Sequence, residues 1–304
     1  MEYRTLPHGG EKISVIGLGM GSIHNVNVGE CERIVRTALD AGINYLDFVP
    51  SKAVAFEGYA RALKGQRDRA MLQVHIGADY SSGNYAWTTD VNRAVAQFKE
   101  RLKLLGPAYA DFGFIHCIDE DADFDKVTNG GIWDWALKAK QDGTIRHLGF
   151  STHSVSIARR FLSTGMMDMG MFSMNPMYDY TDESAYGKGE AADRAELYRQ
   201  FEAAGVGISV MKAFAGGQLL DAKESPFGHA LTTDQCIQYV LDKPGVLTVL
   251  PGVRNMGDLD DALAFLDATP DERDYSIIGT FAPPSDKGRC VYCNHCQPCP
   301  EGIL

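Results

Sequence analysis

The fold of this chain is decided by residues 111–154, DFGFIHCIDEDADFDKVTNGGIWDWALKAKQDGTIRHLGFSTHS. The apolar run Phe112–Ile115 predicts a buried strand, and the acidic, turn-prone segment Asp119–Asp125 follows it. Ile132–Gln141 then carries apolar residues at helical spacing, and Ile145–Phe150 is a second apolar strand. The stretch is therefore a strand, a helix and a strand, with a polar residue directly after each strand. Parallel α/β folds collect such strand ends on one face and place their chemistry there.

The same unit recurs along the chain. Further strands are predicted at Ile13–Gly17, Ile43–Leu46, Ala70–Val74, Met169–Met174, Val206–Met211 and Val246–Leu250. Further helices are predicted at Glu30–Leu39, Ala53–Leu63, Asp90–Leu105, Ser154–Leu162, Asp193–Ala204, Thr233–Leu241 and Gly257–Leu266. Strands and helices that alternate along the chain form a parallel sheet, and eight such strands close the sheet into a barrel. The sequence therefore predicts an α/β protein, a (β/α)8 TIM barrel, with an N-terminal hairpin before its first strand.

Composition narrows the class of protein. The chain has 304 residues, of which 45% are hydrophobic and 23% charged, so we expect an ample core. A net charge of −11 argues against a nucleic-acid or anionic-membrane surface. No apolar run approaches the ~20 residues of a membrane span, and Met1–Gly10 has no signal-peptide core. We therefore expect a cytoplasmic protein that acts on a small-molecule substrate.

Polar side chains stand at the predicted strand ends. Taken singly, each has a structural explanation, such as capping a helix or a satisfied buried histidine. Together, at successive ends of barrel strands, they indicate the active site of an enzyme. They are Asp47, His75, His116, Ser151, Asn175, Lys212 and Arg254.

Six segments, in order over residues 1–270, carry a resemblance to a known family. They are Gly17–Gly21, Ala41–Asp47, Phe114–His116, Gly143–His153, Gly205–Lys212 and Leu250–Asn255. In these segments the chain resembles the aldo-keto reductases, and in particular a bacterial branch with a C-terminal 4Fe–4S ferredoxin-type motif. The resemblance implies a barrel over residues 1–275 and a short cysteine-rich iron–sulfur segment over residues 276–304.

The family reduces carbonyls with a hydride from NADPH, and uses an Asp, a Tyr, a Lys and a His around the carbonyl oxygen. The resemblance places the Asp at Asp47 and the His at His116. The Tyr position, five residues after Asp47, holds Lys52, and the Lys position holds His75. Because an acid catalyst needs a pKa near the operating pH, Lys52 beside His75, or either histidine directly, would have to donate the proton. Other candidate donors are Tyr59, Tyr80 and Tyr85.

The resemblance also implies the residues that bind NADP(H). Ser151 and Thr152 match the pair that hydrogen-bonds the nicotinamide amide, and Met211 takes the place of a ring-stacking Tyr. The Pro251–Arg254 turn opens the last helix, where backbone N–H groups and Arg254 suit the ribose phosphate. The expected cofactor contacts are Gly19, Met20, Asp47, Ser151, Thr152, Asn175, Met211, Lys212, Gly252, Arg254 and Asp258.

Four thiols at intervals of three residues form the sharpest motif: Cys290, Cys293, Cys296 and Cys299, with Pro300 after them. Runs of this type bind iron–sulfur clusters, and a closing Cys-Pro is typical of them. Zinc is the alternative, although its cysteine pairs usually flank a longer loop. We expect a 4Fe–4S cluster and an electron-transfer partner. Members of the resembling branch continue beyond this point, whereas the chain given ends five residues after Cys299, so we expect a truncated module.

Two functions remain open from the sequence. The first is an NADP(H)-dependent oxidoreductase that acts on a small carbonyl or related redox substrate, with Lys52 and His75 as an altered catalytic pair. The second is a barrel that has lost its redox residues and binds a nucleotide or ligand in a regulatory role. The long loop Tyr178–Ala192 is a candidate substrate lid in either case.

Overall fold

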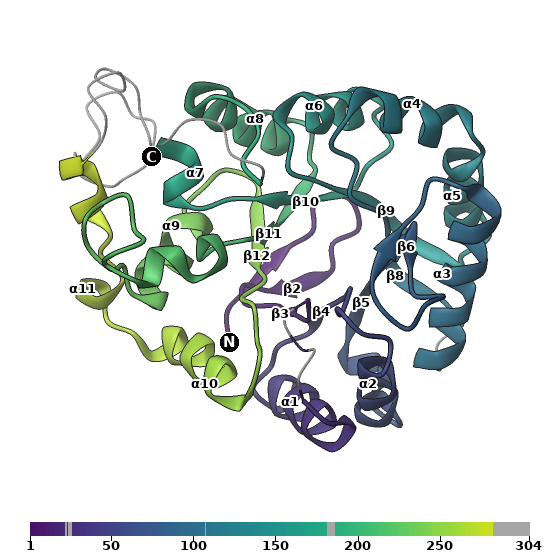
Figure 1. Ribbon diagram of the computed structural model, residues 1–304, viewed down its shortest axis with the longest axis horizontal. Helices are drawn as coiled ribbons and strands as arrows, with labels where there is room; N and C mark the ends of the chain where they lie inside the picture. The colour runs from purple at the N-terminus through teal and green to yellow at the C-terminus, as the bar shows by residue number, and fades with distance from the viewer. Residues whose placement is uncertain (22, 24–25, 107, 181–185, 282–304) are drawn as a thin grey trace.

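The computed structural model describes residues 1–21, 23, 26–106, 108–180 and 186–281. Its centre is an eight-stranded parallel sheet in the order β12-β11-β10-β9-β8-β5-β4-β3, surrounded by helices (Figure 1). Bridges between Ile16 and Val249 and between Gly19 and Gly252 join the two ends of the sheet. The curled sheet is consistent with a (β/α)8 barrel. Its strands are β3 (Leu18–Gly19), β4 (Tyr45–Phe48), β5 (Met71–Ile76), β8 (Ala110–Ile115), β9 (Ile145–Thr152), β10 (Met169–Ser173), β11 (Gly207–Met211) and β12 (Val246–Val249).

The helices lie outside the strands and bury their apolar faces against them. The α-helices are α1 (Val28–Asp40), α2 (Ala55–Leu63), α3 (Val91–Leu105), α4 (Asp121–Asn129), α5 (Ile132–Gln141), α6 (Val155–Ser163), α7 (Pro176–Tyr180), α8 (Ala191–Ala203), α9 (Thr233–Leu241), α10 (Met256–Ala264) and α11 (Pro270–Arg273). Short 3-10 helices are η1 (Arg67–Arg69), η2 (Ala215–Leu220), η3 (Phe265–Asp267) and η4 (Ser276–Phe281). Within the described ranges, none of the helices has the length and apolar content needed to cross a membrane.

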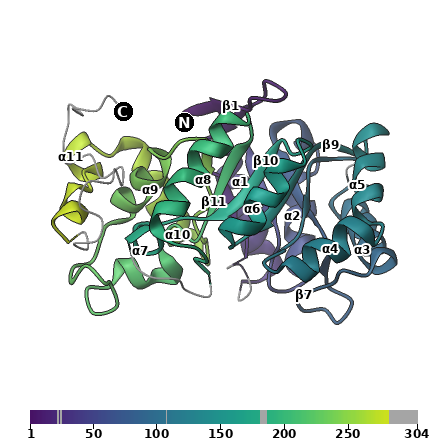
Figure 2. The same ribbon diagram turned by 90° about the horizontal axis from the view of Figure 1, so that it is seen from above.

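The N-terminal hairpin pairs β1 (Tyr3–Thr5) with β2 (Lys12–Ser14). Its residues Leu6 and Ile13 are fully buried and join the cluster inside the ring of strands. A second antiparallel pair, β6 (Ala78–Asp79) with β7 (Ala86–Trp87), lies at the opposite end of the molecule (Figure 2). The hairpin therefore closes one end of the barrel, and the end that carries β7 is left for the site.

The order of the core elements confirms the sequence prediction, with helix starts set by local chemistry. Asp90 accepts a hydrogen bond from Arg93 N at the start of α3, and Gly106 ends that helix with a φ of 82°. Ser154 likewise caps α6. These side chains satisfy N–H groups that the first helical turn leaves unpaired.

One segment corrects the sequence prediction. Residues expected to form an acidic turn, Asp119–Asp125, lead instead into helix α4. Phe124 and Val127 lie one helical turn apart and are both buried, while Asp121 and Asp123 stand in the first turn, where negative charge favours the helix dipole. The high charge of the segment concealed this two-residue apolar stripe.

A buried polar network joins α7, α8 and α9. Asp179 accepts hydrogen bonds from Arg194 Nε at 2.9 Å, from the hydroxyl of Tyr198 at 2.6 Å and from that of Tyr239 at 2.8 Å. The side chain of Arg194 is 0% exposed. Burial opposes its charge, but Tyr198 and Asp179 outweigh burial and raise the pKa of the guanidinium. The network fixes the chain that follows β10.

Candidate active site

A cavity of about 530 Å³ opens at the C-terminal ends of the barrel strands. Asp47 and His75 lie near the ends of β4 and β5, and His116 directly follows β8. The structure thus brings these three sequence-predicted catalytic residues together. Side chains and backbone from most of the ring line the cavity, including Gly19, Asp47, His75, Tyr85, His116, Ser151, Met211, Lys212, Gly252, Arg254 and Asp258.

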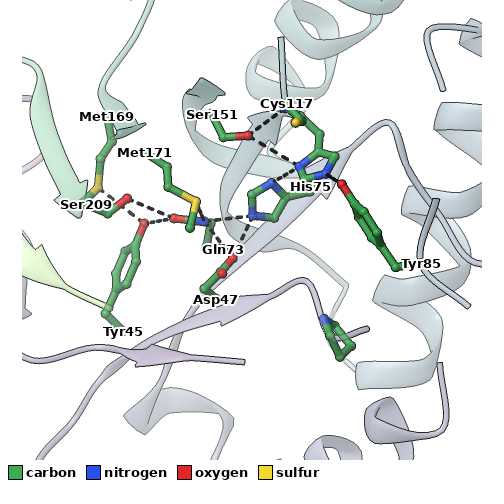
Figure 3. Close-up of polar contacts among 12 residues, drawn as sticks. Tyr45, Asp47, Gln73, His75, Tyr85, Cys117, Ser151, Met169, Met171 and Ser209 are labelled. Atoms are coloured by element: carbon green, nitrogen blue, oxygen red, sulfur yellow. Dashed lines mark hydrogen bonds and ion pairs between the residues drawn. The ribbon is translucent and has the colours of Figure 1, made fainter. Parts of the chain in front are cut away.

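Four side chains form a continuous series of hydrogen bonds. Nε2 of His75 lies 2.7 Å from Oδ1 of Asp47, and Nδ1 of His75 lies 2.8 Å from Nδ1 of His116. Nε2 of His116 lies 2.6 Å from the hydroxyl of Tyr85. Figure 3 shows Asp47 and Tyr85 on opposite sides of His75. A carboxylate, two imidazoles and a phenol are therefore linked from the barrel interior to the rim.

Gln73, two residues before His75 on the same face of β5, fixes the inner end of this series. Its Nε2 donates to Oδ1 of Asp47 at 2.8 Å, while its Oε1 accepts from the hydroxyl of Tyr45 (Figure 3). Burial raises the pKa of Tyr45 well above its ordinary value, so its hydroxyl remains a donor. Because the carboxylate of Asp47 can only accept, the amide of Gln73 must turn its N–H₂ group toward Asp47, which leaves its Oε1 to accept from Tyr45.

These bonds assign the mobile protons. Asp47 is the acceptor at the inner end, so Nε2 of His75 carries the hydrogen that faces it. With one hydrogen per neutral imidazole, Nδ1 of His75 then accepts from Nδ1–H of His116. Nε2 of His116 is left to accept from Tyr85. From Tyr85 to His75 every donor points toward Asp47. Nε2 of Gln73 also lies 2.9 Å from Nε2 of His75, and the two nitrogens share Oδ1 of Asp47 as their acceptor.

The environment keeps the outer members of the series neutral. Burial, and then the neighbouring His75 and His153, lower the pKa of His116 well below its ordinary value. Burial, followed by Cys117 and Asp119, raises the pKa of Tyr85. His116 is therefore an unprotonated imidazole and Tyr85 a protonated phenol at neutral pH.

Lys52 does not join this group, which corrects the sequence expectation. Its side chain is exposed, and its backbone pairs with that of Asn84 in an antiparallel bridge. A lysine on a surface loop gains more from hydration of its ammonium group than from a place beside two histidines. The tyrosine position of the resembling family is therefore turned to solvent.

Tyr85 was one of three tyrosines that the sequence could not place. Tyr59 is a fully buried residue of α2, and the hydroxyl of Tyr80 donates to Pro50 O at 2.6 Å. Tyr85 alone of the three lines the cavity that the described residues form.

The expected cofactor contacts divide into two sets. Gly19, Asp47, Ser151, Met211, Lys212, Gly252, Arg254 and Asp258 line the cavity. Met20, Thr152 and Asn175 are fully buried in the surrounding structure. Thr152 donates to Asp119, and Nδ2 of Asn175 donates to Lys212 O at 2.8 Å. The latter two polar side chains are thus used to hold loops, and neither contributes surface to the cavity formed by the described residues.

Arg254 has a partner that sequence matching did not reveal. Its Nε and one terminal nitrogen donate to the two carboxylate oxygens of Asp258 at 2.8 and 2.9 Å. This fork lowers the pKa of Asp258, so its carboxylate stays charged. The Arg254 side chain is nevertheless 71% exposed, and a phosphate group can reach its outer face.

Cys117, Asp119 and His153 form the other ionisable cluster beside the cavity, with ligand atoms within 4.8 Å of one another. Burial, and then Asp119, raise the pKa of Cys117 to about 11, so its sulfur is a thiol. Oδ2 of Asp119 already contacts Nδ1 of His153 at 2.9 Å, and Oδ1 accepts from Thr152 and His153 N. Metal binding requires a thiolate and free carboxylate oxygens, so the internal bonds explain the cluster better than a cation does.

Two residues of the cavity wall have strained backbone. Cys117 and Lys212 adopt φ values of 52° and 64°, which non-glycine residues rarely take up. Strain of this kind gathers at functional sites, where surrounding contacts hold it. The four cysteines proposed for iron, Cys290, Cys293, Cys296 and Cys299, lie outside the described residues.

Comparisons with known proteins bear on the family and the fold of the chain. The model of the aldo/keto reductase family matches residues 15–233. L-glyceraldehyde 3-phosphate reductase of Escherichia coli (strain K12) is 26% identical over 164 residues, which are 51% of this chain and 46% of that protein. The chain thus spans about half the length of this curated relative.

Solved structures share the fold. An aldo-keto reductase of Bacillus halodurans in its holo form superposes with a TM-score of 0.75 at 21% identity, over 93% of this chain and 97% of that chain. An aldo/keto reductase of Klebsiella pneumoniae in complex with NADP and acetate superposes with a TM-score of 0.65 at 18% identity, over 93% and 96% of the two chains.

Proposed function

Because the chain belongs to the aldo/keto reductase family, we propose that it is an NADP(H)-dependent oxidoreductase that acts on a small carbonyl or related redox substrate. One observation supports this most strongly: Asp47, His75 and His116 are hydrogen-bonded to one another at the wall of a cavity at the strand ends. A redox-inert ligand site has no need for an ordered series of proton carriers.

The residues of the wall fit the chemistry of a dinucleotide. Lys212 and Arg254 both line the cavity and offer cations to a diphosphate and a ribose phosphate. Ser151 accepts from Cys117 N at 2.8 Å, and its hydroxyl hydrogen is available to a carboxamide oxygen. NADPH, when bound, would supply a hydride to the carbonyl carbon. Met211 offers a polarizable apolar surface against which a planar ring can rest.

The alternative function is a regulatory barrel that binds a ligand without turning it over, and the exposed Lys52 at the family's tyrosine position favours this alternative. An experiment that measures both binding and turnover separates the two functions. We expect a fluorescence titration to show NADPH binding, and a panel of small aldehydes and ketones to show oxidation of the bound NADPH. Binding without turnover of any carbonyl or electron acceptor would leave the regulatory function as the better account. Absence of binding to NADPH and NADH would remove both.

The preference for NADPH over NADH is expected to depend on Arg254. Its replacement in Arg254→Ala should weaken NADPH binding roughly tenfold and leave NADH binding nearly unchanged, because only the 2′-phosphate uses the guanidinium. The matched variant Asp258→Asn should strengthen NADPH binding. It removes a carboxylate that competes with the phosphate for the guanidinium of Arg254. Isothermal titration of both cofactors measures this. Equal losses for the two cofactors in Arg254→Ala would place the phosphate elsewhere.

The proposal extends to a 4Fe–4S cluster on Cys290, Cys293, Cys296 and Cys299, which would exchange electrons with a partner. Protein purified without oxygen should be brown and contain about four iron and about four sulfide ions per chain. Cys293→Ser should lose most of both, whereas Cys117→Ser, in the described part of the chain, should keep them. Zinc in place of iron, with no sulfide, would assign the thiols to a zinc site.

A further inference from the structure

We propose that Tyr85 is the acid that protonates the substrate oxygen, and that His116, His75 and Asp47 form a relay that stores and returns its proton. The inference rests on the oxidoreductase function proposed above. It assigns a catalytic residue that lies on a different loop from Lys52, the residue that occupies the family's tyrosine position.

Geometry permits proton transfer at every link. The three contacts of the series measure 2.6, 2.8 and 2.7 Å from Tyr85 to Asp47. The rings of His75 and His116 meet edge to face with centroids 4.6 Å apart, and those of Tyr85 and His116 do so at 5.6 Å. Packing of this kind holds both histidines in the orientation that the hydrogen bonds need.

Exposure is graded along the relay. Asp47 is 2% exposed, His75 1% and His116 8%, whereas Tyr85 is 39% exposed. All four residues line the cavity, but Tyr85 presents by far the most surface to solvent. Its hydroxyl is therefore the most accessible point at which a proton can enter or leave the series.

The loop that carries Tyr85 is fixed by backbone bonds to the loop after β4. Tyr85 N donates to Ser51 O at 3.0 Å, and Ala53 N donates to Gly83 O at 3.1 Å. Lys52 and Asn84 form the bridge between these two bonds. The loop that contains Lys52, the tyrosine position of the family, is thus paired with the loop that contains Tyr85. Tyr85 supplies a phenol to the cavity from this second loop.

The proton steps balance. In the loaded relay one extra proton makes His75 an imidazolium, paired with Asp47 through Nε2–H. Nδ1–H of His75 then donates to His116, whose Nε2–H donates to the oxygen of Tyr85. This frees the phenolic hydrogen to face the cavity.

Delivery moves each proton one place outward. When hydride reaches the carbonyl carbon, the substrate oxygen becomes an alkoxide, and Tyr85 breaks its O–H bond to form the alcohol. The phenolic oxygen takes the hydrogen of His116, and His116 takes that of His75. NADPH is oxidised, the carbonyl is reduced, and His75 ends neutral. A proton from solvent then reloads the relay through Tyr85.

A relay resolves a difficulty with Tyr85 as an isolated acid. Burial raises the pKa of its hydroxyl, so loss of the proton without replacement would be slow. Concerted transfer from His116 means that a phenolate never accumulates at Tyr85. The alkoxide and the imidazolium are both neutralised in the same step.

The test compares two tyrosines of one loop. Tyr85→Phe should lower the rate of NADPH oxidation in single turnovers by ~10²-fold, the scale of a lost general acid, with NADPH affinity unchanged. Tyr80→Phe is the matched control, because its hydroxyl donates to Pro50 O rather than entering the cavity, and its rate should stay within about threefold. A Tyr85→Phe rate within threefold of wild type would overturn the inference and leave the proposed function standing. A wild type that turns over nothing would overturn the proposed function and this inference with it.

Two further readouts separate an acid relay from a structural role. Reduction by wild type should slow as pH rises, because the relay loses its stored proton, and this dependence should disappear in Tyr85→Phe. The rate of wild type, plotted against the deuterium fraction of the solvent, should curve because several protons move together. The same plot should be linear for Tyr85→Phe. Unchanged pH dependence and curvature in Tyr85→Phe would show that the relay does not pass through this residue.

Discussion

Replacement of Asp179 by alanine is expected to lower the free energy of unfolding by about 3–5 kcal/mol, the cost of breaking a buried ion pair from one side. Arg194 is fully buried, and its Nε donates to Asp179. Without that carboxylate the guanidinium has no buried counter-charge in the network, and the hydroxyls of Tyr198 and Tyr239 lose their acceptor. Denaturation by urea, followed by fluorescence, measures the loss.

The double variant Asp179→Leu with Arg194→Met provides the control. It removes both charges and fills their volume, so it should recover most of the stability that Asp179→Ala loses. Asp179→Asn should fall between the two, because its amide oxygen still accepts from the tyrosines but carries no charge. If Asp179→Ala unfolds within 1 kcal/mol of wild type, water must replace the carboxylate, and the network does not hold α7 and α8 together as described.

Replacement of Asp47 by asparagine is expected to lower kcat by ~10³-fold, within the range of lost acid–base catalysis. The carboxylate accepts from His75 at 2.7 Å and from Gln73 at 2.8 Å, and its charge compensates a buried imidazolium. An asparagine oxygen can still accept, but it offers no compensating charge. The loss should therefore fall on kcat. Steady-state kinetics measure it.

Asp119→Asn is the matched control for Asp47→Asn. Burial acts to raise the pKa of Asp119, but hydrogen bonds from His153 and Thr152 outweigh burial and lower it. This variant therefore also removes a negative charge at the same end of the barrel. Its carboxylate contacts His153, outside the relay, and its kcat should change less than about threefold. A comparable fall in both variants would mean that net charge near the cavity, rather than the contact with His75, governs the rate.

The sequence predicted the barrel because strand and helix periodicity are local properties. It also predicted that Asp47, His75 and His116 meet, since parallel strand ends converge. The same reasoning could have found Gln73, a polar residue that shares a face of β5 with His75 at a spacing of two. The order of elements and the inner half of the relay were thus readable from pattern alone.

The outer half of the relay was not readable in this way. Counting five residues from Asp47 selects Lys52, but the loop conformation turns that side chain to solvent. Tyr85 reaches the cavity only because backbone bonds join its loop to Ser51 and Ala53, and such pairing between distant loops leaves no periodic signal. Thr152 and Asn175 are the opposite case. Both occupy positions where the family resemblance predicts cofactor contacts, but their side chains hydrogen-bond to neighbouring loops instead.

The pairing of the two loops also has an evolutionary consequence. Lys52 and Asn84 are joined through main-chain atoms, so substitutions at either position leave the alignment of the two loops intact. An ancestor with a tyrosine at position 52 can gain a second one at position 85 before losing the first. Position 52 faces solvent in this chain, so Tyr85 is the phenol that stays over the cavity once the first tyrosine is lost. The proposed acid can therefore move from one loop to the other while the pairing of the two loops is kept.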